Sequence, residues 1–277
     1  MEAVLADRKT PRRARTRLTP KACALELARY GGPLLTLVLL WQAMVWWKQW
    51  PPYLLPGPLE VARTFSSLLV EGILLQHLVS SIKVLLLGSI AGMAVAIPLG
   101  FWIATWRPAS IFFNPIVTVL QPIPGIAWIP LAILWFGLGR TAIGFIIFLS
   151  VFFPILLNTI TGVRTINREL LRVARVMLCP LWMVVTDVIV PGALAYIITG
   201  LRIGLGYGWR ALVAGEMIAA TSGLGYMIFD ARNYLKTDEV IVGMATIGLF
   251  WALVERVLLK PLEQRTIERW GMARAAA

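Results

Sequence analysis

The chain has 277 residues, of which 58% are hydrophobic and only 14% are charged, and its mean hydropathy is +0.77. Soluble domains, disordered chains and coiled coils have more polar surface than this, so the composition indicates an integral membrane protein. The net charge of +12 does not indicate nucleic-acid binding, because the basic residues gather beside apolar segments rather than among stacking aromatic residues.

Six apolar segments are long enough to cross the membrane as helices, for which about 20 residues suffice. They are residues 30–47, 78–105, 114–136, 141–162, 193–220 and 240–259. The first follows a basic run, as a secretory signal would. It leads into WWKQWPP instead of the small residues of a cleavage site, so we expect an uncleaved span with an interfacial tryptophan belt. The sequence predicts an all-α membrane domain over residues 30–262.

Lys and Arg residues are concentrated on one of the two sides that six spans define. They gather in the N-terminal tail at residues 1–29, in the loop at residues 163–190, and around the C-terminal tail at residues 263–277. Because basic residues favour the cytoplasmic side, we expect both termini in the cytoplasm.

Small residues recur at every fourth position in the second and fifth spans. The two sets are Gly88, Gly92, Ala96 and Gly100, and Gly200, Gly204 and Gly208. A spacing of four keeps them on one helical face, where helix backbones approach closely in lipid. We expect two packing seams.

The third span contains Pro122, Pro124 and Pro130 with Gly125. Each proline removes a backbone donor and disfavours a helical conformation in the residue before it. Free backbone groups at membrane depth persist only against protein or a wet cavity. This segment is either the wall or gate of a translocation path or merely a kink.

The fifth span contains Arg202, Arg210 and Glu216. Ionisable groups inside a membrane normally face the bundle interior or a cavity and have partners. Two interpretations remain open: ion pairs that tie this span to its neighbours, or contact with an anionic substrate. Arg210 and Glu216 are six positions apart and point to different sides of one helix, so we expect each to pair with other groups.

The loop after the fourth span is predicted to contain two short helices. Its apolar residues fall on one helical face: Leu170, Leu171, Ala174, Met177 and Leu178. Pro180 suits the first turn of the second helix, and Pro191 is expected to end that helix before the fifth span. The first helix either lies on a membrane surface held by anionic lipid or docks a cytoplasmic partner.

Three segments of the chain resemble the permease subunits of ABC importers, in the group that handles nitrate, sulfonates, taurine and bicarbonate. They read LLPGPLEV at residues 54–61, QPIPGIAWIPLAILWFGLG at 121–139 and TGLRIGLGYGWRALVAGEMIAATSGLGYMI at 199–228. The resemblance, which extends over residues 33–270, implies the type I ABC importer permease fold with six transmembrane helices in a bacterial inner membrane. It also implies a second and identical permease subunit, ABC ATPase subunits, and an extracytoplasmic binding protein that delivers a small anion.

Permeases of this kind carry a docking loop written EAA-x3-G-x9-I-x-L-P. When Pro191 sets the register, the glutamate position falls at Arg172, the alanines at Val173 and Ala174, and the glycine at Leu178. Only Ala174 and Pro191 match, so we expect docking with altered contacts. The resemblance places docking at Leu170, Leu171, Arg172, Ala174, Arg175 and Leu178. It places the translocation path at Pro122, Pro124, Trp128, Pro130, Arg210 and Glu216.

The chain contains no G-x-x-x-x-G-K-[ST] loop, so we expect no cofactor here, ATP and Mg on the partner ATPase, and no enzymatic activity in this chain itself. An ion-coupled secondary transporter or channel is the alternative function. A membrane enzyme lacks candidates, because Cys23, Cys179 and His77 are scattered and supply neither a metal site nor a triad. The cargo is not specified; a sulfonate such as taurine is the first candidate.

Overall fold

The computed structural model describes residues 20–269, and within this range it contains helices and turns but no strand. The chain divides between Pro51 and Pro52 into two compact units, a boundary inside the predicted domain of residues 30–262. The first unit contains α1 (Pro20–Lys48), which covers the first predicted span and starts before it. The outer parts of the two predicted tails, residues 1–19 and 270–277, lie outside the described residues.

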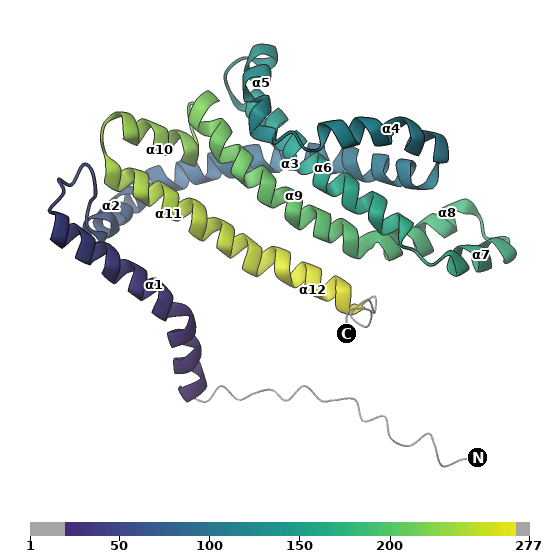
Figure 1. Cartoon of the computed structure of the whole chain (residues 1–277), viewed down its shortest axis with the longest axis horizontal. Helices are drawn as coiled ribbons and strands as arrows, with labels where there is room; N and C mark the ends of the chain where they lie inside the picture. Colours follow the sequence, from purple (N-terminus) through teal and green to yellow (C-terminus); the bar gives the residue numbers. More distant parts are fainter. Residues whose placement is uncertain (1–19, 270–277) are drawn as a thin grey trace. The chain divides into compact units, whose positions relative to one another are not determined.

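Three long helices form the centre of the second unit: α3 (Ile73–Thr105), α6 (Arg140–Arg164) and α9 (Val190–Ala219). α6 packs against both α3 and α9, and Figure 1 shows α6 and α9 side by side along their length. The contacts use the predicted small residues. A Cβ atom at Gly88 would lie 2.8 Å from the Gly144 carbonyl oxygen of α6, and one at Gly200 would lie 2.7 Å from the Asn158 Cβ of α6. Both predicted packing seams are therefore confirmed, and both face α6.

The third predicted span, residues 114–136, is broken at the prolines that were expected to disturb it. The chain forms α4 (Arg107–Leu120), then a short 3-10 turn, η1 (Gly125–Trp128), and α5 (Ile129–Phe136). The two helical parts are bent by 87°. The physical cause is the pair Pro122 and Pro124, neither of which can donate a backbone hydrogen bond; Pro124 adopts an extended conformation at φ −64° and ψ 142°.

Two other prolines are accommodated without a break. The helix expected to end at Pro191 runs from Trp182 to Ala219. This helix consists of α8 (Leu181–Val184), η2 (Val185–Ile189) and α9. A second helix of the same kind, around Pro261, consists of α11 (Thr237–Val254), η3 (Glu255–Leu259) and α12 (Lys260–Arg269). η2 and η3 are π turns two residues before Pro191 and Pro261. Such a turn bonds each N–H to the fifth residue back, so the helix continues past a residue without an N–H.

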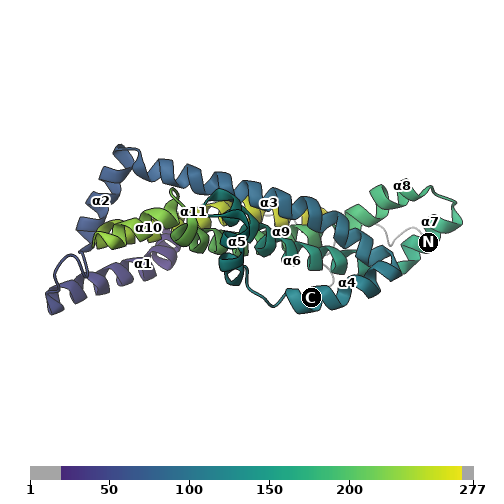
Figure 2. The ribbon, with the colours of Figure 1, turned by 90° about the horizontal axis from the view of Figure 1, so that it is seen from above.

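The remaining helices lie at the ends of this bundle. α2 (Pro58–Val70) packs on α11 and α3, and α10 (Leu224–Asn233) packs on α9 and α11. α7 (Arg168–Val176) and α8 connect α6 to α9 at the opposite end of α9 from α10, as Figures 1 and 2 show. The fold therefore places the proposed docking loop and α10 at the two ends of one helix.

Four helical stretches of the described chain are long and apolar enough to cross a membrane. They are Ile73–Thr105, Arg140–Arg164, Trp182–Ala219 and Thr237–Gln264, and the bent α4–α5 pair raises the number to as many as five. α1 is not among them; Gln42 and its several tryptophans are less apolar than the residues of the other spans. The all-helical membrane class is confirmed, whereas six spans are not all seen.

Candidate functional site

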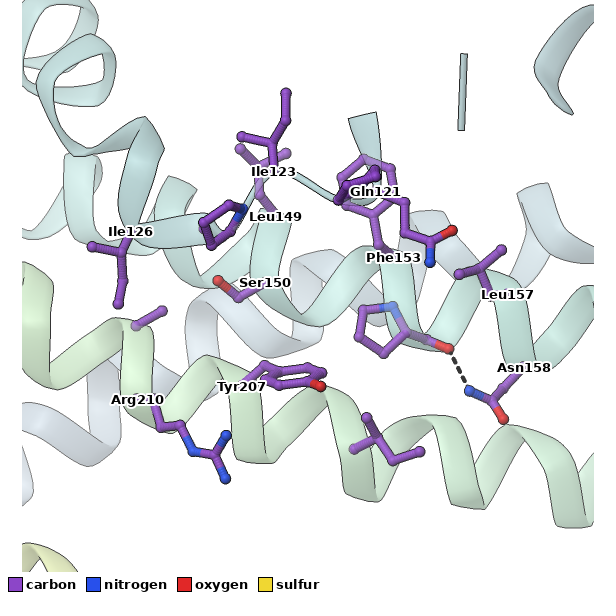
Figure 3. A pocket seen from close by; sticks show the side chains of 16 residues that line it. Gln121, Ile123, Ile126, Leu149, Ser150, Phe153, Leu157, Asn158, Tyr207 and Arg210 are labelled. Atoms are coloured by element: carbon purple, nitrogen blue, oxygen red, sulfur yellow. Dashed lines mark hydrogen bonds between the residues drawn. The ribbon is translucent and has the colours of Figure 1, made fainter. Parts of the chain in front are cut away.

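The second unit contains a cavity of about 520 Å³ where the α4–α5 break faces the middle of α6 and α9. Residues 121–126 of the break form one wall, and Figure 3 shows side chains of α6 and α9 facing it. Its polar lining consists of Gln121, Ser150, Asn158, Tyr207 and Arg210, and none of the described residues that line it is acidic. The cavity is therefore largely apolar with a single positive charge.

The cavity depends on the proline break and on Gly125. Because the backbone turns away from a helical course after Gln121, α4 and α5 do not fill the space above α6. Gly125 lies so close to α6 that a side chain there would collide with the Ser150 hydroxyl. The prolines of this segment thus leave the cavity open, and Gly125 allows the backbone of the segment to approach α6 closely.

Hydrogen bonds already use part of the polar lining. The Ser150 hydroxyl donates to the Ile146 carbonyl at 2.8 Å, and the Asn158 amide donates to the Pro154 carbonyl at 2.8 Å. The Arg210 guanidinium lies 5.7 Å from the centroid of the Tyr207 ring, a cation–π distance. No carboxylate of the described residues lies within ion-pair distance of Arg210.

The structure brings together half of the residues predicted for the path. Pro122, Pro124 and Arg210 line the cavity, whereas Trp128, Pro130 and Glu216 do not. The indole N–H of Trp128 is buried and has no acceptor among the described residues. Among the lining residues that sequence reasoning missed, four are polar: Gln121, Ser150, Asn158 and Tyr207. The available signal for them was a polar side chain within an otherwise apolar segment.

Glu216 belongs to a separate buried network. It is only 1% exposed, and its two carboxylate oxygens accept hydrogen bonds from the Ser81 hydroxyl at 2.7 and 2.9 Å. The backbone N–H of Gly225 donates to the same carboxylate at 2.9 Å. Glu216 and Arg210 therefore point to different sides of α9, as predicted, and neither pairs with the other.

The same network holds the beginning of α10. The N–H of Gly223 donates to Nδ1 of His77 at 3.1 Å, and the N–H of Leu224 donates to the Ser81 hydroxyl at 2.9 Å. These are helix-terminal donors that have no partner within their own helix. His77 and Ser81 serve as their acceptors and do not bond each other in the described structure, so this group has the geometry of a helix cap and not of a catalytic triad.

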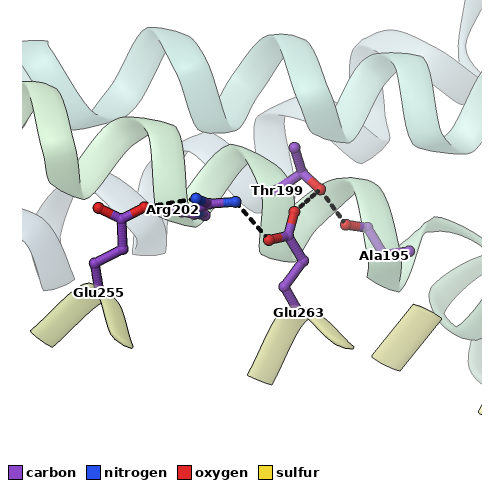
Figure 4. A network of polar contacts seen from close by, with 5 residues as sticks. All are labelled: Ala195, Thr199, Arg202, Glu255 and Glu263. Atoms are coloured by element: carbon purple, nitrogen blue, oxygen red, sulfur yellow. Dashed lines mark hydrogen bonds and ion pairs between the residues drawn. The ribbon is translucent and has the colours of Figure 1, made fainter. Parts of the chain in front are cut away.

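Arg202 has two carboxylate partners. Its guanidinium contacts Glu255 at 2.5 Å and Glu263 at 2.7 Å, and Figure 4 shows the three side chains between α9 and the last helical segments. Thr199 also donates to Glu263, at 3.4 Å. The interpretation of structural ion pairs therefore fits Arg202, which joins α9 to η3 and α12.

The predicted docking residues on and after α7 have different exposures. Leu170, Arg172 and Leu178 are exposed, with Leu178 at 89%, whereas Leu171 is half-buried and Ala174 is only 8% exposed. The side chain of Arg175 lies outside the described part of the chain. Leu171 packs against a cluster of Val163 at the end of α6, Ile189 in η2 and Ala193 at the start of α9.

Further apolar side chains on and just after α7 are exposed; Met177 belonged to the predicted apolar face, whereas Val173 and Val176 did not. Val173, Val176 and Met177 are 56%, 82% and 71% exposed. Together with Leu170 and Leu178 they form what we call the outer apolar face of α7. The amphipathic pattern was visible in the sequence, but which apolar residues face the bundle depends on the packing of α7 against α6 and α9.

Comparisons with known proteins give consistent results. The family described as binding-protein-dependent transport system inner membrane component matches residues 96–259. The chain is 34% identical to the taurine transport system permease protein TauC of Escherichia coli strain K12, over 84% of this chain and 86% of TauC. It is also 34% identical to the riboflavin transport system permease protein RibX of Chloroflexus aurantiacus, over 92% of this chain and 96% of RibX.

A solved structure shares the fold. The MetNI methionine ABC transporter in inward-facing conformations matches with a TM-score of 0.56 and 19% sequence identity, over 69% of this chain and 92% of that chain.

Proposed function

The chain belongs to the family of binding-protein-dependent transport inner membrane components, and from this we propose that it forms the translocation pathway for a small sulfonate-type anion. It is a membrane-spanning permease subunit of an ABC importer. Importers of this family work with an ATPase and a binding protein. In the proposed assembly the second permease subunit is another copy of this chain, and ATP and Mg are bound by the partner ATPase.

The charge of the cavity is the observation that supports an anionic cargo. TauC and RibX are equally identical to this chain, so family membership alone leaves the cargo open. The cavity between the α4–α5 break, α6 and α9 has one basic and no acidic lining residue among those described. A positively charged, mostly apolar lining favours an anion with a short hydrocarbon part.

The outer apolar face of α7 is the proposed docking surface for the ATPase. Its residues are exposed although they are apolar, which is typical of a surface that a partner covers. The inner side of α7 packs through Leu171 on Val163, Ile189 and Ala193. A displacement of α7 would therefore be passed to α6 and α9, and α9 carries Arg210 to the cavity. This is the contact through which ATP binding would switch the pathway between inward and outward opening.

The proposed orientation has both termini and the α7–α8 loop in the cytoplasm. It follows from the basic residues of the tails and of residues 163–190. α10, at the other end of α9, then lies at the side where the binding protein delivers the solute.

The ion-coupled alternative has less support from the site. It would need Arg202, Arg210 and Glu216 to act together, yet Arg202 pairs with carboxylates of the last helical segments, Glu216 caps α10, and Arg210 faces the cavity.

A docking experiment tests the proposal. The double variant Leu170→Asp/Val173→Asp places two charges on the outer apolar face of α7 and leaves its packed side intact. We expect it to insert in the membrane and to lose co-purification with the ATPase. Leu138→Asp is the matched control. Leu138 is also an exposed leucine, and it lies just before the start of α6, at the end of that helix away from α7. ATPase retention by the double variant would show that docking occurs elsewhere.

A further inference from the structure

Arg210 differs from the other arginine on the same helix in having no acidic partner. Arg202 contacts two carboxylates, whereas no acidic residue in the described structure lies within ion-pair distance of Arg210 or lines its cavity. A guanidinium inside a membrane segment is costly and is normally compensated by an anion or by water in a cavity. Arg210 is exposed, and among the described residues no carboxylate competes with an anion that would bind its guanidinium.

The polar lining of the cavity, at Arg210 and further along α9, can bind an anion. On α9, Tyr207 lies one turn before Arg210 on the cavity side, and its ring is in cation–π contact with the guanidinium. The Asn158 amide has used one N–H on Pro154 and retains a second donor. Gln121 supplies a further amide from the α4–α5 break. The lining thus offers the charged donors of Arg210 and several neutral donors.

The rest of the lining is apolar. Ile123, Phe153, Leu157 and Ile203 line the same cavity. The volume of about 520 Å³ lies within the range in which proteins bind small molecules. A solute with one anionic head and a short hydrocarbon tail would find partners for both parts.

We propose that this cavity is a solute-binding subsite of the permease itself, in which Arg210 binds the sulfonate group of the cargo and the apolar lining contacts its hydrocarbon part. This inference rests on the proposed function and adds to it a resting place for the solute between the binding protein and the cytoplasm. Planar, multiple N–H donors make arginine well suited to an oxyanion.

Direct binding to the assembled complex tests the subsite. The purified permease–ATPase complex, without the binding protein, is equilibrated with radiolabelled ethanesulfonate, which has one anionic head and a short hydrocarbon tail. We expect saturable binding that Arg210→Gln weakens by about 10- to 100-fold, as expected for loss of a charge-assisted hydrogen bond. Arg210→Lys keeps the positive charge, so we expect a smaller loss of sulfonate affinity than in Arg210→Gln.

Lys83→Gln is the matched control. It removes one positive charge from α3, a membrane helix that contributes no residue to the cavity, and Lys83 is itself exposed. We expect its affinity for the sulfonate to equal that of the unmodified chain. Equal affinity in Arg210→Gln, or an equal loss in Lys83→Gln, would overturn the proposal.

A second measurement does not depend on a variant. Ethanesulfonamide has nearly the shape of ethanesulfonate and no charge, so the unmodified complex should prefer the sulfonate by at least about tenfold. Equal binding of the two would overturn the subsite. Failure of the proposed function is distinguishable from this result, because the complete importer with its binding protein would then take up no sulfonate, whereas a wrong subsite leaves uptake intact.

Discussion

Replacement of Glu216 by alanine would distinguish a structural carboxylate from one that contacts solute. In the structure the carboxylate accepts from the Ser81 hydroxyl and from the Gly225 N–H, and all three groups are buried. Glu216→Ala leaves two buried donors without an acceptor, at about 1–3 kcal/mol each. We expect the free energy of unfolding to fall by about 2–6 kcal/mol.

Glu216→Gln is the conservative comparison. Its amide keeps the size of the side chain and one acceptor oxygen, while its NH2 group can donate to Ser81. We expect a loss of about 1 kcal/mol, the difference between a charge-assisted and a neutral hydrogen bond. Unfolding of the detergent-solubilised permease by SDS titration gives both values. If Glu216→Ala keeps its stability and loses only solute uptake, the carboxylate acts on the solute and the capping role is refuted.

Two further predictions concern helix contacts. Arg202→Met removes the partner of Glu255 and Glu263, so amide hydrogen exchange in α12 should become faster. Because the ion pairs are partly exposed, the loss of local stability should be about 1 kcal/mol. Unchanged exchange would argue against the contact. Gly88→Val forces a side chain against the Gly144 carbonyl and should destabilise the fold by about 1–3 kcal/mol, whereas Gly144→Ala, which meets no atom within 4 Å, should not; equal effects would contradict the packing of α3 on α6.

Periodic features of the fold could be predicted from the sequence. A four-residue spacing of glycines determines which helical face carries small residues, so the seams at Gly88 and Gly200 follow from the pattern. That both seams pack against α6 could not be predicted, because the sequence does not state which helix fills a seam. Likewise Pro122 and Pro124 predict a disruption, but the 87° bend depends on packing against α6.

The π turns mark a limit of local rules. Pro191 was expected to end a helix because it lacks an N–H, yet the structure satisfies the surrounding groups by hydrogen bonds to the fifth residue back, from Val190 to Val185. The same arrangement before Pro261 makes α12 a continuation of the last span. Whether a proline breaks or merely widens a helix is decided by the tertiary contacts on either side of it.

The candidate site was predicted in part. Charge within an apolar span identified Arg202, Arg210 and Glu216, and their spacing showed that Arg210 and Glu216 face different ways. Their partners could not be predicted, since Ser81 and Glu255 are far from them in sequence. α7 shows the same limit, because its amphipathic pattern does not specify that Ala174 faces the bundle.

Uptake into sealed vesicles tests whether ATP drives transport through this chain. The vesicles contain this chain together with its ATPase, the binding protein and labelled taurine are added outside, and MgATP is enclosed in one preparation and omitted from another. We expect uptake against a gradient only with MgATP and with the ATPase present. Concentrative uptake driven by an ion gradient alone, without nucleotide, would contradict it.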